Sequence, residues 1–360
     1  MARRAPARRG GQPAMTTPGR LMAAEIAEQP QVWRRLLVEG AEVIRAAAAK
    51  INTYAPRFVL FVGRGSSDHA ALYAKYLVEI THRLPAGLVS PSTMTVYGAQ
   101  PELRDVLYIA VSQSGSSPDL VKAVEIARGR GALTVAVTNN PNSGLTAAAE
   151  IHVDVLAGQE GSVAATKSYT AELLALYLLL DRVRGGDGRQ AAPLPDLGAQ
   201  VLAGDDFVDA LAQRYRFAQR FLITGRGYSF PTACEAALKL METCYVCAQA
   251  FSGADLLHGP LASVDPQVPV LAVVPEGAGG QAMLPVLARL AERHADVVAI
   301  GAGLAREKVA GRIPLPSGTP EELSPLLEIL PLQRLALHLA IARGGDPDQP
   351  RALHKVTETL

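Results

Sequence analysis

An internal repeat is the feature of this sequence that most constrains its fold. Residues 57–79 read RFVLFVGRGSSDHAALYAKYLVE and residues 220–242 read RFLITGRGYSFPTACEAALKLME, an offset of about 162 positions. Each copy runs from an apolar stretch, through GRG and a few small or turn-forming residues, into an amphipathic helical pattern. Two further apolar strands follow each copy at similar distances, beginning at Asp105, Leu133, Val268 and Ala295. The repeat therefore predicts two domains of like topology.

Short apolar strands that alternate with longer helical patterns are typical of α/β folds, in which helices cover both faces of a parallel sheet. We predict two tandem, doubly wound, flavodoxin-like parallel-sheet domains in pseudo-repeat. The expected parts are a disordered basic tail (1–21), a helical lead-in with Trp33 on a packing face (22–50), a first domain (51–185), a Gly- and Pro-rich linker with the boundary near Pro193 (186–205), a second domain (206–345) and a C-terminal tail (346–360).

Composition excludes several classes of function. The net charge is +1, so no global field attracts nucleic acid or an acidic membrane. Apolar runs stay below the ~18 to 20 residues that a bilayer span needs, which predicts a soluble protein.

The three cysteines, Cys234, Cys244 and Cys247, fall in one segment, which favours a reducing cytoplasm over a secreted disulfide framework. The pair Cys244 and Cys247 lacks a second ligand pair, so we interpret these thiols as buried core residues and expect no metal.

Polar residues follow the second strand of the first domain, where ligands bind in open α/β sheets. This strand ends in Ser112, Gln113, Ser114 and Gly115, and Ser117 then caps a helix that begins at Pro118. Hydroxyls beside a helix N-terminus are the chemistry of a phosphate site, although a polar loop with a good cap is the simpler alternative. The matching strand of the second domain ends in Pro-Glu-Gly (275–277), so we predict one phosphate site per chain. A dinucleotide fingerprint is less consistent with the sequence, because both GRG turns lack the third glycine.

The second domain carries candidate acid and base groups. Glu235, Lys239 and Glu242 share one helix face, with the lysine between the two carboxylates. The alternative is an exposed ladder of ion pairs, but apolar neighbours and a helix that starts at the strand ends favour a partly dry cleft. A carboxylate held near a lysine in such a cleft can act as a base. His258 follows in a predicted loop and is a plausible proton carrier.

Taken together, these motifs resemble the SIS (sugar isomerase) family, with the domain present twice as in the isomerase half of glucosamine-6-phosphate synthase. The matching segments are EIAEQP (25–30), SQSG (112–115), VAATKSYTAEL (163–173), the E-x-x-x-K-x-x-E face (235–242), LLHGPLA (256–262) and DQPRALHKVTETL (348–360). They run in the family's order from about residue 22 to the last residue.

The resemblance implies a hexosamine or hexose 6-phosphate as ligand and no cofactor. The residues implied to hold the phosphate are Ser67, Ser112, Gln113, Ser114 and Ser117, and those implied to line the sugar are Val163 and Glu160. It makes Glu242 the base that moves a proton between C1 and C2, with Lys239 and Glu235 beside it. His258 would open the sugar ring in the partner subunit's site, which implies a homodimer. Lys355 corresponds to a lysine that forms a Schiff base with the open-chain ketose.

One departure from the synthase bears on the activity. The synthase begins with a glutaminase domain whose nucleophile is an N-terminal cysteine, and this chain has no cysteine before Cys234. We therefore expect no glutamine cleavage by that route. The motifs look most like stand-alone SIS-type glucosamine-6-phosphate deaminases, which release fructose 6-phosphate and ammonia. A synthase-like enzyme that uses free ammonia, a fructosamine-phosphate deglycase and a sugar-phosphate sensor without catalysis remain as alternatives, and the hexosamine isomer is left open.

Overall fold

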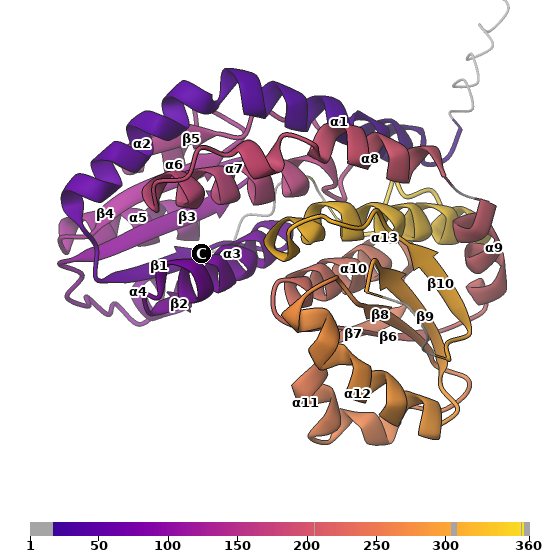
Figure 1. Ribbon diagram of the computed structural model, residues 1–360. Coiled ribbons are helices and arrows are strands. Elements are labelled where there is room, and N and C mark those ends of the chain that lie inside the picture. The colour runs from indigo at the N-terminus through magenta and orange to yellow at the C-terminus, as the bar shows by residue number, and fades with distance from the viewer. Residues whose placement is uncertain (1–16, 205, 304–307, 354, 356–360) are drawn as a thin grey trace, which may run out of the picture.

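The computed structural model describes residues 17–204, 206–303, 308–353 and 355, so most of the predicted basic tail, 1–16, lies outside the described residues. The chain forms two lobes, each built around a five-stranded parallel sheet (Figure 1). The strand orders are β2-β1-β3-β4-β5 and β10-β9-β8-β6-β7. Counted along the chain within each lobe, both follow the 2-1-3-4-5 order of flavodoxin-like folds. The predicted fold class is confirmed.

The first lobe contains the first copy of the repeat. Its elements are β1 (Phe58–Val62), α3 (Ser66–Leu77), the π-helical turn η1 (Val78–His82), β2 (Ala86–Leu88), α4 (Ser92–Thr95), β3 (Val106–Ser112), α5 (Pro118–Gly129), β4 (Leu133–Thr138), α6 (Gly144–Ala148), β5 (Ile151–Asp154) and α7 (Lys167–Val183). Every residue of β3 is buried, which explains its uninterrupted apolar run. Helix α7 is buried over most of its length and forms the back of the first lobe's core.

The second lobe repeats this plan. Its elements are β6 (Arg220–Gly225), α10 (Ser229–Cys244), β7 (Cys247–Ser252), α11 (Gly253–Leu257), η3 (Pro260–Ser263), β8 (Pro269–Val273), α12 (Ala278–Glu292), β9 (Asp296–Gly301), β10 (Gly311–Pro314), η4 (Glu321–Leu323) and α13 (Ser324–Ala342). The two copies of the repeat thus form β1–α3 and β6–α10. Helix α13 is apolar enough to span a membrane, but the chain buries 78% of its most hydrophobic window, as expected for a core helix.

Helices outside the repeat join the two lobes. The lead-in forms α1 (Arg20–Glu39) and α2 (Ala41–Tyr54), so helix begins two residues earlier than the predicted boundary. Trp33 on α1 is buried as predicted, and its Nε1 donates to Thr170 Oγ1 on α7 at 3.1 Å. In Figure 1 helices α1, α8 and α13 lie along the junction of the lobes.

The segment predicted as a linker is largely helical. It contains η2 (Arg189–Ala191) and α8 (Leu194–Ala203), and α9 (Asp206–Tyr215) follows. Gly198, one of the residues that suggested a flexible connection, lies where α8 meets α1: a Cβ there would be 2.4 Å from Cζ3 of Trp33. The glycine permits close helix packing, and sequence composition does not distinguish that use from flexibility.

The three cysteines do not share one environment. Cys244 is buried and Cys234 is partly buried, but Cys247 is exposed at the start of β7. The prediction of three core thiols is therefore wrong for Cys247. β7 is the edge strand of the second sheet and only one of its six residues is buried, so the side chain of its first residue can reach solvent.

The repeat extends to a buried serine–glutamate pair in each lobe. In the first, Ser67 Oγ lies 2.9 Å from Glu172 Oε1 on α7, within hydrogen-bond distance. In the second, Ser229 Oγ donates to Glu328 Oε1 on α13 at the same distance. Burial raises the pKa of Glu328 to about 7, although hydroxyls from Ser324, Ser229 and Thr232 oppose the shift. Burial also raises the pKa of Glu172, so each lobe holds a carboxyl that resists ionisation.

The Glu328 carboxyl predicts a pH-dependent contribution to stability. Because its folded pKa is raised from 4.5 to about 7, the folded state retains a proton that the unfolded chain releases, so stability falls as pH rises through this window. We expect the wild type to lose up to about 3 kcal/mol of unfolding free energy relative to Glu328→Gln between these pH values. Urea unfolding of both proteins between pH 4.5 and about pH 7 measures this difference in the free energy of unfolding. If the free energies of the two proteins changed in parallel with pH, Glu328 would not have the raised pKa.

Candidate functional site

A cavity of about 340 Å³ lies at the carboxyl ends of the first lobe's strands, where α10 and the C-terminal segment meet them. Its walls are Arg64, Gly65, Ser66, Ser67, Ser112, Gln113, Ser114, Ser117, Val163, Ala165, Glu242, Leu353 and Lys355. It brings together all five predicted phosphate residues, one predicted sugar contact, the candidate base and the candidate Schiff-base lysine. Residues as far apart in the chain as Arg64 and Lys355, and from both lobes, thus share one cavity.

The loop between β3 and α5 is shaped to present hydroxyls. Gly115 has a φ of 64°, and a Cβ there would lie 2.2 Å from Ser143 Oγ, so the turn requires glycine. Its N–H donates to Ser112 Oγ at 3.1 Å. Ser117 is the N-cap of α5 and Pro118 is its first residue, as predicted. The Ser117 side chain makes no capping hydrogen bond within the described residues, which leaves its hydroxyl for the cavity.

The equivalent place in the second lobe is already filled by a carboxylate from the chain itself. Glu321 accepts hydrogen bonds from the N–H groups of Ala278 at 2.8 Å and Gly279 at 2.7 Å, at the N-terminus of α12. A carboxylate at a helix N-terminus takes the position that an external anion would take. This contact supports the prediction of a single phosphate site per chain.

The acidic face of α10 is buried and closely paired. Lys239 Nζ lies 2.5 Å from Glu242 Oε2 and 3.3 Å from Glu235 Oε1. The side chains of Lys239 and Glu235 are fully buried, whereas that of Glu242 is 23% exposed and reaches the cavity. Burial disfavours the ammonium, but the two carboxylates outweigh it and raise the pKa of Lys239 above its usual range. The arrangement is therefore a charged network at a cavity wall and not an exposed ladder of ion pairs.

Two residues that sequence reasoning did not single out connect this network to the first lobe. Ser66 Oγ donates to Glu235 Oε1 at 2.9 Å and accepts from Lys239 Nζ at 3.1 Å. His69 Nδ1 lies 2.8 Å from Glu235 Oε2. Ser66 and His69 are three residues apart directly after GRG, so they lie on one helix face. This spacing is the sequence feature from which they could have been identified. These contacts hold α3 and α10 together beside Glu242.

Glu160 lies behind the cavity wall and does not line it. Its carboxylate accepts from Thr166 N at 3.0 Å, Ser168 N at 3.1 Å and Lys355 Nζ at 2.9 Å. Burial alone would raise the pKa of Glu160, but the Lys355 ammonium and these hydrogen bonds together lower it. The resemblance implied that Glu160 lines the sugar, whereas here it holds Lys355 at the cavity.

The EIAEQP segment on α1 supports the loop that carries Val163. Glu25 accepts hydrogen bonds from the N–H groups of Gly161 and Ser162. Burial raises the pKa of Glu25, against the lowering effect of the Gly161 N–H. Asp348 in turn accepts from Leu21 N at 2.8 Å at the start of α1. This hydrogen bond links the start of α1 to the C-terminal segment. Lys355 lies farther along the same segment and reaches the cavity.

His258 lies apart from the cavity. It is exposed, directly after α11 in the second lobe, and it is not among the cavity-lining residues. Within one chain the structure does not bring it to the other predicted groups.

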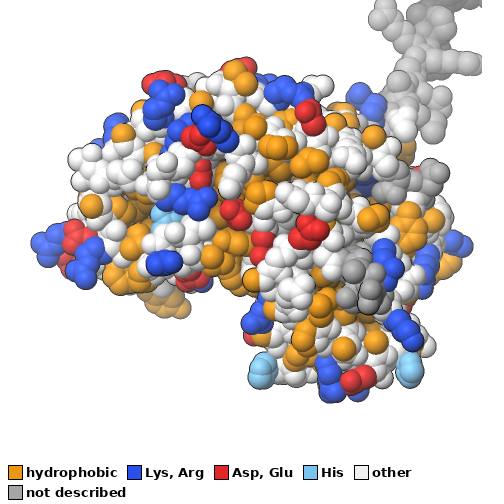
Figure 2. Space-filling model, viewed as in Figure 1, with side chains coloured by type: hydrophobic (Ala, Val, Ile, Leu, Met, Phe, Trp, Pro, Cys, Tyr) orange, Lys and Arg blue, Asp and Glu red, His pale blue; other side chains and the backbone are white. Residues whose placement is uncertain are grey.

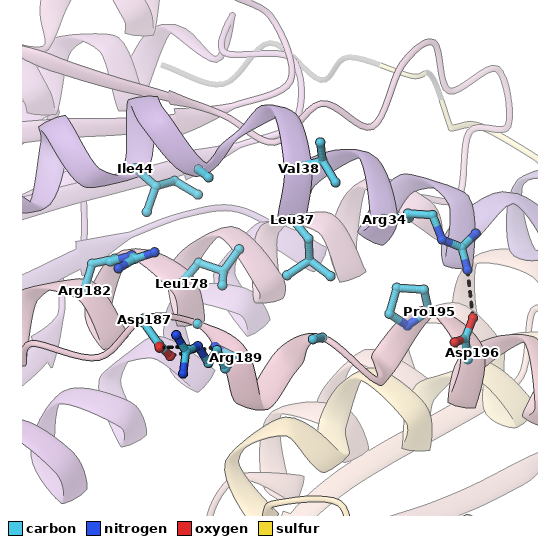
Figure 3. Close-up of a pocket in the computed structure, with 13 residues that line it drawn as sticks. Arg34, Leu37, Val38, Ile44, Leu178, Arg182, Asp187, Arg189, Pro195 and Asp196 are labelled. Carbon is cyan, nitrogen blue, oxygen red and sulfur yellow. Dashed lines mark hydrogen bonds and ion pairs between the residues drawn. The ribbon is translucent and has the colours of Figure 1, made fainter.

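A second cavity, of about 360 Å³, lies between α1, α2 and α7 and the segment from η2 to α8 (Figure 3). Two of its arginines pair with its two aspartates, Arg34 with Asp196 at 2.8 Å and Arg189 with Asp187 at 2.7 Å. The third, Arg182, donates to the Gly186 carbonyl at 3.3 Å. Hydrophobic side chains gather on the surface where α1 and α8 meet (Figure 2). Because both aspartates are already paired and the three arginines do not converge on one point, this cavity lacks the polar chemistry of the first.

Comparison with known proteins agrees with the two-lobed fold. Residues 54–182 and 215–342 each match the SIS domain. The chain is a member of the SIS domain family. It is 34% identical over 347 residues to the isomerizing glutamine–fructose-6-phosphate aminotransferase of Thermococcus kodakarensis, covering 93% of this chain and 57% of that protein. The SIS chain thus spans just over half of the curated relative, and it is homologous to the isomerase half.

Solved SIS structures show the same architecture. A candidate phosphosugar isomerase of Silicibacter pomeroyi DSS-3 has a TM-score of 0.84 and 35% identity, over 91% of this chain and 99% of that one. The C-terminal domain of the Francisella tularensis glucosamine-fructose-6-phosphate aminotransferase has a TM-score of 0.82 at 25% identity, over 91% and 98%. A glucosamine-6-phosphate deaminase of Thermotoga maritima shares the fold, with a TM-score of 0.72 at 21% identity over 94% and 100%.

Proposed function

We propose that this SIS protein is an isomerising amino-sugar phosphate deaminase that converts glucosamine 6-phosphate and water to fructose 6-phosphate and ammonia. One observation carries the proposal: a single cavity combines the hydroxyl-rich loop at the N-terminus of α5 with Glu242 and Lys355. The hydroxyls suit a phosphate, which only accepts hydrogen bonds. Glu242 and Lys355 suit chemistry at the other end of the same molecule.

The reaction divides among these groups in three steps. His258, supplied by a second subunit of a homodimer, opens the sugar ring. Glu242 then removes the proton at C2 and returns it to C1, which converts the amino aldehyde to a C2 imine by way of an enolamine. Water adds to this imine, and the C2–N bond breaks to release ammonia and leave the ketone.

Lys239 and Lys355 have different parts in this scheme. Lys239 is fully buried and its Nζ lies 2.5 Å from Glu242 Oε2, so it holds in place the carboxylate that accepts a proton. Lys355 Nζ donates to Glu160 and to the Ser162 carbonyl, and Glu160 is an adjacent acceptor for the proton that the amine must lose before it attacks a ketose carbonyl. We place the reaction in the cytoplasm and assign no metal or cofactor to it.

The test is a screen of glucosamine 6-phosphate, galactosamine 6-phosphate and fructosamine phosphates for release of ammonia or amine. We expect ammonia and fructose 6-phosphate from glucosamine 6-phosphate. Amine release from fructosamine phosphates alone would identify a deglycase. The aminotransferase names of the curated relatives favour a second reading, the reverse reaction from free ammonia and fructose 6-phosphate, which the same assay detects. Binding without any turnover would indicate a sensor and overturn the proposal.

Ser114→Ala is expected to weaken fructose 6-phosphate binding by about 1 to 3 kcal/mol, the usual contribution of a hydrogen bond to a charged group. Ser114 lines the cavity and is not fully exposed. Calorimetric titration measures the change. Ser92→Ala, at an exposed serine of the same lobe, is the matched control. Equal affinity of the Ser114 variant and the wild type would place the phosphate elsewhere.

A further inference from the structure

Ser67 differs from the other serines of the cavity because its hydroxyl faces a buried carboxyl. Ser67 lines the cavity at 7% exposure, and Ser67 Oγ lies 2.9 Å from Glu172 Oε1. Glu172 is 1% exposed, and its second oxygen, Oε2, has no hydrogen-bond partner among the described residues. An ionised carboxylate served by one hydroxyl would be poorly satisfied, whereas a neutral acid leaves only one acceptor oxygen unpaired.

We propose that Glu172 is a positioning residue of the phosphate site: as a neutral acid it donates its proton to Ser67 Oγ, which turns the Ser67 hydroxyl hydrogen toward the bound phosphate. The inference rests on the proposed phosphate site and deepens it. Phosphate oxygens only accept, so a serine contributes to binding only if its own hydrogen points at them. With an ionised Glu172, Ser67 would donate inward and present lone pairs to the phosphate.

The surroundings of Glu172 favour the neutral acid. The charged groups that act most strongly on it are two acids, Glu160 from the loop before α7 and Glu235 from α10, and the Lys355 ammonium. Glu235 is itself paired with Lys239. The Lys355 ammonium is itself held by Glu160 and the Ser162 carbonyl. Tyr169 on α7 is the other titratable neighbour, and burial keeps its phenol neutral by raising its pKa far above the usual range.

Among the remaining helices that pack on α7, α1 brings Glu28, whose carboxylate pairs with Lys167 of α7 at 2.7 Å, so this pair adds no net charge. From α1, Gln29 Oε1 accepts from Thr170 Oγ1, and from α13, Gln333 Nε2 donates to the Thr166 carbonyl. Helix α2 packs with apolar residues only, and α3 supplies Ser67 and the buried Tyr73. Burial raises the pKa of Glu172 well above its usual range, although the Ser67 hydroxyl opposes the shift.

The proposal predicts how affinity depends on pH. Below the folded pKa of Glu172 the acid is neutral and Ser67 donates to phosphate. As pH rises through that value the carboxylate forms, takes the Ser67 hydrogen and repels the phosphate, so affinity falls. Glu172→Gln keeps the shape and donates permanently through its amide nitrogen. It should therefore bind at neutral pH as the wild type does and retain that affinity at alkaline pH.

The experiment is calorimetric titration of the full chain with fructose 6-phosphate between about pH 7 and about pH 10, above the second phosphate pKa of about 6. We expect the wild type to lose about tenfold or more in affinity across this window, and Glu172→Gln to lose much less. Glu328→Gln is the matched control. It removes the repeat-related carboxyl of the second lobe, which bonds to Ser229 and lies outside the cavity, so its profile should follow the wild type.

Ser67→Ala separates this mechanism from a general charge effect. Without the Ser67 hydroxyl there is nothing to reorient, so the single variant should bind more weakly at neutral pH and show a reduced pH dependence. Parallel profiles of wild type and Glu172→Gln would overturn the inference while leaving the phosphate site in place. No binding of fructose 6-phosphate by the wild type would overturn the site and the inference together. Binding with the expected profile but no deaminase activity would refute only the proposed reaction.

Discussion

Glu242→Gln is expected to lower turnover of glucosamine 6-phosphate by about 10²- to 10⁴-fold, the range that a general base contributes, with little loss of sugar-phosphate binding. The carboxylate of Glu242 reaches the cavity, and Oε2 lies 2.5 Å from the buried Lys239 ammonium. An amide of the same shape cannot accept a proton. Exchange of the C2 hydrogen with deuterium from solvent, followed by NMR, should be lost together with ammonia release.

Glu292→Gln is the matched control for this variant. Glu292 on α12 also pairs with a cation three residues away, Arg289, but the pair is exposed and remote from the cavity. We expect wild-type turnover from it. If the Glu242 variant kept wild-type exchange at C2, another group would be the base and the proposed division of labour would be wrong.

Lys239→Met is expected to lower the free energy of unfolding by about 3 to 5 kcal/mol, the usual cost of removing one partner from a buried ion pair. Lys239 is fully buried between Glu235 and Glu242. Without its ammonium, Glu235 is a fully buried carboxylate whose remaining partners among the described residues are Ser66 and His69. Urea unfolding at neutral pH measures the change.

Two further variants separate burial of charge from loss of packing. Lys75→Met breaks an i,i+4 pair with Glu79 whose two side chains are partly exposed, so it should cost about 0 to 1 kcal/mol. Combining Lys239→Met with Glu235→Gln removes the stranded charge and should recover part of the stability. A Lys239 variant no less stable than the Lys75 variant would show that the buried network contributes little to folding.

Much of the site was accessible from sequence because parallel sheets put strand ends on one edge. The repeat implied two similar sheets, and the difference between SQSG and the Pro-Glu-Gly of 275–277 indicated which strand end suits an anion. The spacing of Glu235, Lys239 and Glu242 indicated a shared helix face, and the structure confirms their pairing. Such features repeat with the period of a helix or a strand, so they can be read without knowing the tertiary structure.

Contacts between distant segments could not be read in this way. Local patterns do not show that Glu321 fills the N-terminus of α12, that Ser66 and His69 reach Glu235 across the lobes, or that Glu160 holds Lys355. The same holds for Gly198, which permits close packing on Trp33. Each depends on how helices pack, and several arrangements satisfy the same amphipathic pattern.

The sequence by itself determined the doubled α/β fold, the strand end that carries the hydroxyls and the helix that carries the acid and base groups. Only the tertiary structure decided that these groups line one cavity, and that the Ser67 hydroxyl lies against the buried carboxyl of Glu172. The reason is physical: periodicity specifies which face of an element is buried, whereas the orientation of a hydroxyl depends on the protonation and burial of groups more than a hundred residues away in the chain.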